Sequence, residues 1–250
     1  MAGHSQFKNI MHRKGAQDAK KAKLFTKLVR EIIVACQKGQ PDPEFNPRLR
    51  SAITAARRSG VARDKIEMAI KKGSGELTGE QYEEMRYEAY GPGGVAIIIE
   101  ALTDNRNRTA SDLRAIFSKL GGNLGESGSV NFMFERVGLV VFSAAVASAD
   151  AMFEAAVMAG AENVNSENDV HEITTAPDAM AAVRDALQEQ FGDPESAKLV
   201  WIAKTETAVD LEGARAILKL VDALEDYDDV QEVFVNYQMD DEVAAKILSE

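Results

Sequence analysis

The N-terminal part of the chain carries apolar residues at helical spacing. One stripe recurs every four positions, at Leu24, Leu28, Ile32 and Cys36. This period predicts an amphipathic helix over 17–38 that stops at Gly39. On the opposite face the same period places a basic row, which consists of Lys20, Lys23, Lys27 and Arg30. We therefore expect the apolar stripe to pack inward and the basic row to face outward.

Two shorter helices follow in the sequence. The first is expected after the N-cap Asn46, with Pro47 at its first helical position, and ends before Gly60. The next is predicted over 63–72 and is closed by Gly73. Each has an apolar face, so the three helices can bury one another in a small domain.

After a glycine-rich linker the pattern changes to short strands and helices. The first series predicts a strand, a turn, a strand, a helix and a strand at 82–90, 91–94, 95–102, 110–120 and 129–136. The second series predicts a strand, a helix, two strands, a helix and a strand at 139–142, 149–159, 163–165, 170–175, 177–191 and 197–203. The tail supplies a helix and a strand at 211–224 and 230–237.

The second series has the element order βαββαβ of a ferredoxin-like unit. The first series has only half of such a unit, and the tail helix and strand complete it. We therefore expect an α+β fold with an N-terminal three-helix domain and two ferredoxin-like α/β domains, the third inserted in the second. The expected bounds are 1–75 for the helical domain, 80–136 with 206–250 for the discontinuous domain, and 137–205 for the insertion. The alternative, a tail that packs as a separate appendage, leaves one face of the first sheet uncovered.

Charge is distributed unevenly along the 250 residues, whose formal net charge is -11. Residues 1–73 hold 17 Lys+Arg against 6 Asp+Glu, a net of +11, and the remaining 177 residues hold 12 against 34, a net of -22. This split indicates two regions that face different partners. No apolar run is long enough to cross a bilayer, no secretion signal opens the chain, and Cys36 is the single cysteine, so we expect a cytoplasmic protein.

A basic surface of this size repels itself, and a polyphosphate relieves the repulsion by releasing counterions. Nucleic-acid binding is therefore favoured over a merely solvated basic face, which is the usual meaning of a charge run on a single helix. The residues predicted to contact phosphate are His4, Lys8, His12, Arg13, Lys14, Lys20, Lys21, Lys23, Lys27, Arg30, Arg57, Arg58, Arg63, Lys65, Lys71 and Lys72. No side chain can be assigned to a base edge, so no sequence-specific readout is predicted.

A second candidate is the loop after the predicted strand at 95–102. Its backbone N–H groups and its basic side chains can hold a phosphate or contact a partner, through Asn105, Arg106, Asn107, Arg108 and Thr109. The alternative is structural: the asparagines shape a turn, Thr109 caps the helix, and the arginines pair with Asp112 or with acids of another domain. The residues themselves do not decide between the two.

Nothing in the sequence indicates catalysis, a cofactor or a metal site. No nucleophile elbow or phosphate-binding glycine loop is present, and the three histidines and Cys36 lack the spacing of metal ligands. We therefore expect a non-enzymatic protein without a cofactor.

The acidic C-terminal two-thirds of the chain has two interpretations. Negative charge commonly serves solubility, and that is the default. The sharper interpretation is a docking surface for a basic protein, such as a ribosomal protein or RNA polymerase.

Four stretches also carry a family resemblance. They are GHS, NI and HRK within 3–14, YGPGGVA at 90–96, LTDNRNRT at 102–109 and GGNLGESGSV at 121–130. In these stretches, and in their order and spacing over essentially the whole chain, the sequence resembles the YebC/PmpR family. The resemblance implies a helical first domain followed by two α/β domains, and it favours a functional role for the loop at 104–109.

The resemblance also implies a regulatory function. It implies a transcriptional regulator that binds DNA, while mitochondrial relatives of the family activate translation of cytochrome oxidase subunit I. The leading hypothesis is thus a DNA-binding transcriptional regulator that grips the phosphate backbone through its N-terminal domain. The alternative is a translation factor that associates with RNA or the ribosome, and an enzyme that uses an acidic interdomain cleft is a distant third.

Overall fold

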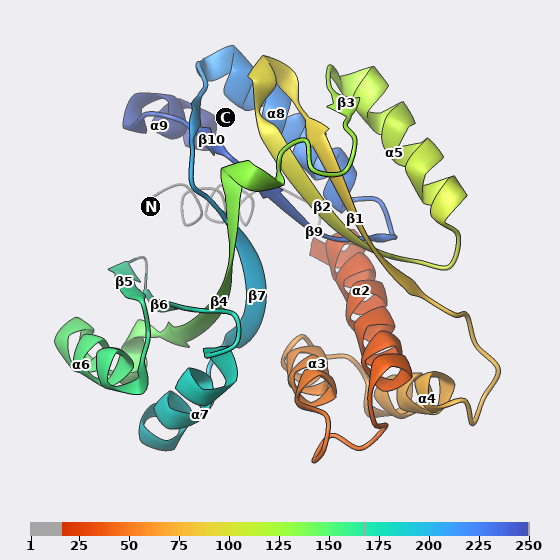
Figure 1. Ribbon diagram of the computed structural model, residues 1–250, viewed down its shortest axis with the longest axis vertical. Coiled ribbons are helices and arrows are strands. Elements are labelled where there is room, and N and C mark those ends of the chain that lie inside the picture. Colours follow the sequence, from red (N-terminus) through yellow and green to blue (C-terminus); the bar gives the residue numbers. More distant parts are fainter. Residues whose placement is uncertain (1–16, 168, 250) are drawn as a thin grey trace. The chain divides into compact units, whose positions relative to one another are not determined.

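The structure is a computed structural model that describes residues 17–167 and 169–249, with side chains from Lys21 onward. In the described residues the first domain contains three helices, α2 (Gln17–Lys38), α3 (Pro47–Arg58) and α4 (Arg63–Ser74) (Figure 1). The buried faces of these helices form one core that includes Ile32, Leu49 and Ile66. The three helices therefore lie where the sequence predicts them. Their apolar faces pack inward as predicted except at Leu24, which is 45% exposed.

Local signals fix the start of α3. The side chain of Asn46 accepts a hydrogen bond from the Leu49 N–H at 3.0 Å, and Pro47 stands at the first helical position. The Asn46 amide also donates to the backbone oxygens of Ala35 and Gln40, both at 2.8 Å. One buried side chain thus caps α3 and ties it to the end of α2.

The prediction that Gly73 closes α4 is wrong. The helix continues to Ser74, and its C-cap is Gly75, whose φ of 85° is left-handed. Gly73 lies inside the helix, where an added Cβ would be 2.5 Å from the Cys36 Cβ and 2.6 Å from the Ile33 oxygen. Gly73 is therefore the residue that lets α4 approach the backbone of α2.

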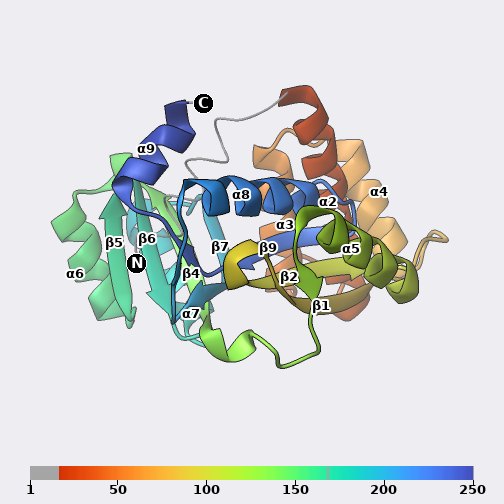
Figure 2. The same ribbon diagram turned by 90° about the horizontal axis from the view of Figure 1, so that it is seen from above.

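The second domain is built on a four-stranded sheet in the order β3-β1-β2-β9. Its strands are β1 (Glu83–Tyr90), β2 (Ala96–Thr103), β3 (Asn123–Leu124) and β9 (Val230–Val235), and its helices are α5 (Arg106–Leu120) and α8 (Leu211–Glu225). The turn between β1 and β2 contains a short 3-10 helix, η1 (Pro92–Gly94). Both long helices cover the same side of the sheet, where Ile97, Phe117 and Ile217 share one core (Figure 2). Because β9 pairs with β2, the C-terminal tail completes this sheet.

The strand predicted at 129–136 does not form in this sheet. The third strand is β3, and a 3-10 turn, η2 (Asn131–Met133), interrupts the predicted segment. The cause is the buried carboxylate of Glu88, which accepts hydrogen bonds at 2.8–2.9 Å from the N–H groups of Gly128, Val130 and Asn131. Those N–H groups are therefore not available to a strand ladder.

Glu88 also has an altered ionisation. Burial by itself raises the pKa of its carboxyl, but the three backbone N–H groups together lower it below the ordinary value. The GESGSV motif at 125–130 is thus a turn folded around an ionised carboxylate on β1.

The third domain is a sheet in the order β5-β6-β4-β7 with two helices. Its elements are β4 (Phe134–Ser143), η3 (Ala144–Val146), α6 (Ala149–Ala159), β5 (Asn163–Glu167), β6 (Val170–Thr175), α7 (Met180–Phe191) and β7 (Ser196–Ala203). Phe142 and Ile173 of the sheet pack against Met152 of α6 and Leu187 of α7, so both helices cover one face. The order of elements and the strand order are those of a ferredoxin-like unit.

The last elements are β8 (Thr207–Ala208), β10 (Tyr237–Gln238) and α9 (Asp241–Ser249). Neither β8 nor α9 was predicted, and the strand predicted at 230–237 is divided into β9 and β10. The acids at 240–242 are typical of a solvated surface, which is the interpretation that the sequence favours. In the structure Asp240 begins the helix, because its side chain accepts a hydrogen bond from the Val243 N–H at 2.8 Å.

The chain divides into two compact units. One is Phe134–Lys204, and the other is the remainder of the chain, which contains both the helical domain and the second domain. The predicted α+β fold, with a helical domain and a third domain inserted in the second, is confirmed.

Replacing Gly73 with alanine tests the close approach of α2 and α4. Alanine favours helix over glycine by about 1 kcal/mol, but the clash at this site should outweigh that preference and destabilise the protein by about 1–3 kcal/mol. The midpoint of urea unfolding, followed by circular dichroism, measures the change. Gly79→Ala is the control, because the three atoms nearest to its added Cβ all belong to the Lys72 side chain, at 3.3–3.5 Å, and no backbone atom is among them. A Gly73→Ala protein as stable as the parent would contradict this account.

Candidate nucleic-acid interface

Part of the predicted basic surface lies outside the described residues. This holds for His4, Lys8, His12, Arg13 and Lys14, and for the side chain of Lys20, whose backbone is helical. The other predicted residues are placed on α2, α3 and α4. They separate into side chains that already have partners within the chain and side chains that face outward.

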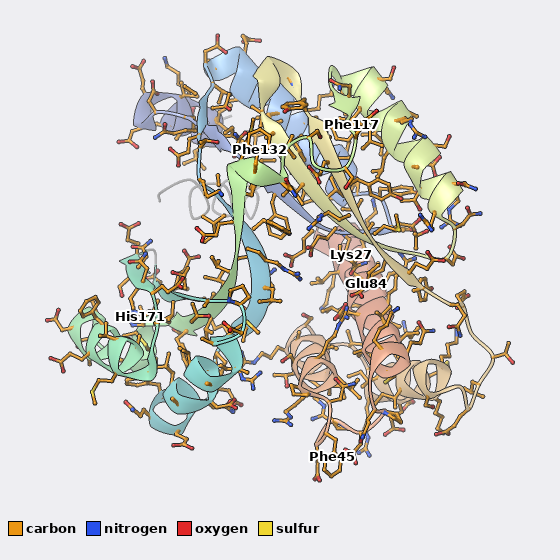
Figure 3. The ribbon with its side chains drawn as sticks, viewed as in Figure 1. Lys27, Phe45, Glu84, Phe117, Phe132 and His171 are labelled. Atoms are coloured by element: carbon orange, nitrogen blue, oxygen red, sulfur yellow. The ribbon has the colours of Figure 1, made fainter. Side chains whose placement is uncertain are left out.

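Two lysines of the basic row on α2 contact the C-terminal end of α8. Lys23 Nζ donates to the Asp226 backbone oxygen at 3.1 Å and pairs with its carboxylate at 2.9 Å. Lys27 Nζ donates to the Glu225 oxygen at 2.9 Å, and its place on α2 is seen in Figure 3. Carbonyl groups at a helix C-terminus lack helical partners and carry partial negative charge, so they attract cations. Burial outweighs the nearby acids and lowers the pKa of Lys27.

Arg30 of the same row is buried in the protein. One of its terminal nitrogens lies within 2.7–3.0 Å of the backbone oxygens of Leu102 and Asp228 and of the Asp229 carboxylate. Its guanidinium also stacks 4.9 Å from the centre of the Tyr82 ring. Only 12% of the Arg30 side chain is exposed. The prediction of an outward-facing row is therefore wrong at Arg30, which joins the helical domain to the second domain.

Asp229 is the centre of this junction. Its carboxylate lies within 3.2 Å of donors from Arg30, Arg108, Thr103 and Thr109. Burial alone raises the pKa of this carboxyl, but the hydrogen bonds and the two guanidinium groups together lower it. Asp229 is therefore an ionised group that holds α2, the end of β2 and the start of α5 together.

The loop at 104–109 accordingly has a structural role. The N-cap of α5 is Asn105, which accepts from the Arg108 N–H at 3.1 Å, and not Thr109, whose buried hydroxyl donates to Asp229 at 2.7 Å. Arg108 pairs with Asp104 and Asp229, both at 2.8 Å. The loop thus uses most of its polar groups inside the protein. Arg106, 62% exposed and 3.7 Å from Glu83, retains an outward-facing charge, and a contact of Arg106 or Asn107 with phosphate or a partner stays a prediction.

The basic side chains with the fewest internal partners lie on α3 and α4. Arg57, Lys65 and Lys71 are exposed, and within the described part of the chain they form no ion pair. Others have a partner: Arg63 pairs with Glu67 at 2.7 Å, Lys72 lies 3.9 Å from Glu80, Arg58 makes a contact within the chain, and Lys21 lies over the Phe25 ring. The exposed α3–α4 surface, defined by Arg57, Lys65 and Lys71, is therefore the described part best placed to meet phosphate.

Sequence reasoning missed the acids that neutralise the helical domain. Arg48 pairs with Glu31 and with Glu84, both at 2.7 Å, and Asp229 neutralises Arg30. The available signal was the acid-rich segment 225–229, which has the charge to match a basic helix. No feature of the sequence indicates which acid in this segment meets which basic residue.

The described residues contain no group of three or more His, Cys, Asp or Glu placed to hold a metal ion. Within that same part, no helix has both the length and the apolar character needed to cross a membrane.

Burial raises the pKa of the Cys36 thiol to about 11, so the thiol is protonated at neutral pH.

Comparison with known proteins gives consistent matches along the chain. Residues 5–76 match the family model of the TACO1/YebC protein N-terminal domain, and residues 82–237 match that of the TACO1/YebC second and third domain. A crystal structure of a conserved hypothetical protein from Aquifex aeolicus is 46% identical in sequence and superposes with a TM-score of 0.84. The match covers 91% of this chain and 94% of that one.

Replacing Asp229 with asparagine tests the junction. The change removes the anion from the largely buried Arg30 and takes one of two carboxylate partners from the half-exposed Arg108, so we expect a loss of about 3 kcal/mol at pH 7. Because the folded-state pKa of Asp229 is lowered below the unfolded value of about 4, its contribution is complete above about pH 5 and is lost as the pH falls through the unfolded and then the folded pKa. The gap in urea midpoint between parent and variant should therefore narrow between about pH 5 and pH 2.

The matched control is Asp228→Asn, because the side chain of Asp228 is exposed and only its backbone oxygen accepts from Arg30. We expect this variant to stay within about 0.5 kcal/mol of the parent at pH 7. A pH-independent gap for Asp229→Asn, or an equal loss in the control, would contradict the role given to Asp229.

Proposed function

Because this chain belongs to the TACO1/YebC family, a family of regulatory proteins, we propose that it is a non-enzymatic regulator that binds nucleic acid through its helical domain. The proposed contacts are with the phosphate backbone, from the α3–α4 surface together with the basic segment before α2. Duplex DNA is the first proposed target, and the proposed role is regulation of transcription. The second and third domains are proposed to position protein partners.

The observation that carries the proposal is the exposure of Arg57, Lys65 and Lys71. Helix α3 contains no acid at all, and its last turn holds Arg57 and Arg58. Four residues separate the end of α3 from the start of α4, so Lys65 lies close in sequence to that basic turn. Cations that lack internal partners gain most from releasing the counterions of a polyanion.

A second candidate function has its own support on α4. Asp64 and Glu67 stand among the exposed residues of this helix beside Arg63 and Lys65. If α4 entered a major groove, these two acids would be brought close to phosphates together with the basic residues, which does not suit such an insertion. Contact by shape and backbone is therefore favoured over base readout, and RNA accepts such contact as well as DNA. The second candidate is a translation factor that acts on RNA or the ribosome.

Substituting Arg57, Lys65 and Lys71 together with alanine tests the surface. All three side chains are exposed, so the fold should survive and binding should weaken for every nucleic-acid sequence tried. The log-log salt dependence should become shallower by about 0.9 per lost contact on duplex DNA and about 0.7 on single strands. Fluorescence anisotropy against salt concentration measures both effects.

The control removes the same charge from the α/β part of the chain. Arg114, Lys119 and Lys219 are exposed on α5 and α8, and their joint replacement with alanine should leave the salt slope unchanged. Equal loss in both variants would mean that only net charge matters, and the proposal for the α3–α4 surface would fail. A parallel titration with single-stranded RNA of the same sequence separates the two candidates, since the preferred target should bind more tightly at every salt concentration.

A further inference from the structure

Helix α6 of the third domain is apolar around nearly its whole circumference. Nine of its eleven residues are Ala, Val, Met or Phe, and the other two are Asp150 and Glu154. A helix with apolar residues on all sides is normally buried on all sides. Only Met152, Ala155 and Ala156 of α6 are buried, however, because the sheet covers one face alone.

The opposite face of α6 exposes large apolar side chains. Phe153 is 54% exposed, Val157 is 53% exposed and Met158 is 90% exposed. Ala149, Phe153 and Val157 are spaced by four residues and therefore form one row on the helix surface, about 12 Å long. The neighbouring helix α7 is different, because its exposed positions include the polar residues Asp185, Gln188 and Glu189. The apolar row is thus particular to α6 and not a general feature of this domain.

Acids run beside the apolar row. Asp150 and Glu154 are four residues apart, and in projection down the helix axis they lie between Val157 and Met158. Helix α6 contains no basic residue. The whole segment 134–204 holds 4 Lys+Arg against 12 Asp+Glu, which gives a net charge of -8. A ligand that binds the apolar row therefore also lies against the carboxylates of Asp150 and Glu154.

We propose that the exposed face of α6, made of Phe153, Val157, Met158, Asp150 and Glu154, binds a basic amphipathic helix of a partner protein. The row of Phe153 and Val157 takes the apolar stripe of that helix, and Asp150 and Glu154 pair with lysine or arginine beside the stripe. Methionine suits such a surface, since its flexible side chain adapts to different neighbours. This site is separate from the α3–α4 surface proposed for nucleic acid.

The charges exclude the competing occupants. In a symmetric dimer through this face both copies bring the same patch, and α6 contains no basic residue, so Asp150 and Glu154 of each copy would gain no cation from α6 of the other. Phosphate backbones and anionic lipid surfaces are repelled by the same two acids. A cationic helix is the occupant that satisfies both the apolar row and the acidic row.

The experiment uses the full chain and a defined probe. The probe is an 18-residue labelled peptide with leucine at helical spacing on one face and lysine on the others. Two control peptides are a scrambled sequence of the same composition, which has no apolar face, and a version with glutamate in place of lysine. Fluorescence anisotropy should show binding of the probe and at least tenfold weaker binding of both controls.

Variants locate the binding site on the protein. Phe153→Ser with Met158→Ser should weaken probe binding at least tenfold, and so should Val157→Lys, which repels the lysines of the probe. Asp150→Asn with Glu154→Gln should weaken binding and remove most of its salt dependence. The matched control is Phe132→Ser, because Phe132 is 62% exposed but lies on η2 (Figure 3). All changed side chains are largely exposed, so the thermal midpoint should not move, and affinity for nucleic acid should stay at the parental value.

Three outcomes would overturn the proposal. The first is undiminished probe binding in both the Phe153/Met158 and the Val157→Lys proteins. The second is equal binding of the scrambled peptide. The third is a parental dimer in sedimentation that Phe153→Ser dissociates, since α6 would then be an interface between copies of this chain.

Discussion

The buried carboxylate of Asp229 is the group on which the arrangement of the helical domain against the second domain depends. It lies just before β9, next to the C-terminal end of α8, and it meets Arg30 of α2 and Arg108 of α5. A buried carboxylate is costly unless donors surround it, and here two guanidinium groups and two threonine hydroxyls do so. Because these donors come from separate parts of the chain, the carboxylate is satisfied only when all of them are in place. The junction is therefore cooperative, and its geometry is defined by charge as well as by apolar packing.

The same acids change how the strong positive charge of the N-terminal segment is distributed. The net of +11 over residues 1–73 counts Lys23, Lys27, Arg30 and Arg48, which already contact acids or carbonyl groups of the chain. The charge that remains available in the described residues shifts to α3 and α4, away from the face of α2 that meets the second domain. An excess of charge in a sequence thus indicates that a polyanion is a plausible ligand, but the folded protein decides which side chains meet it.

Much of the fold follows from local sequence. The bounds of α2 and the N-cap of α3 come from apolar period and capping residues, and the element order predicts the ferredoxin-like insertion. The errors arose where a distant group intervenes: Glu88 binds the N–H groups at 128–131, and Cys36 sets the place of Gly73 in α4. The partners of Lys23, Lys27 and Arg30 are about 200 residues away in sequence. Periodicity places a residue on a face of its own element, but it contains no information about what covers that face.

The exposed fraction along the basic row of α2 determines which of its charges a polyanion can recruit. Lys23 and Asp226 are 38% and 63% exposed, so their ion pair is worth at most about 1 kcal/mol and exchanges readily for a phosphate. Arg30 is 12% exposed and Asp229 is 4% exposed, and separating them would leave an unpaired buried charge at a cost of about 3–5 kcal/mol. A phosphate could therefore bind Lys23 without disturbing the junction, whereas binding to Arg30 would require the helical domain to leave the second domain. The basic row appears uniform in the sequence, but burial divides it: the ion pair of Lys23 can exchange for another anion, and that of Arg30 cannot without unfolding the junction.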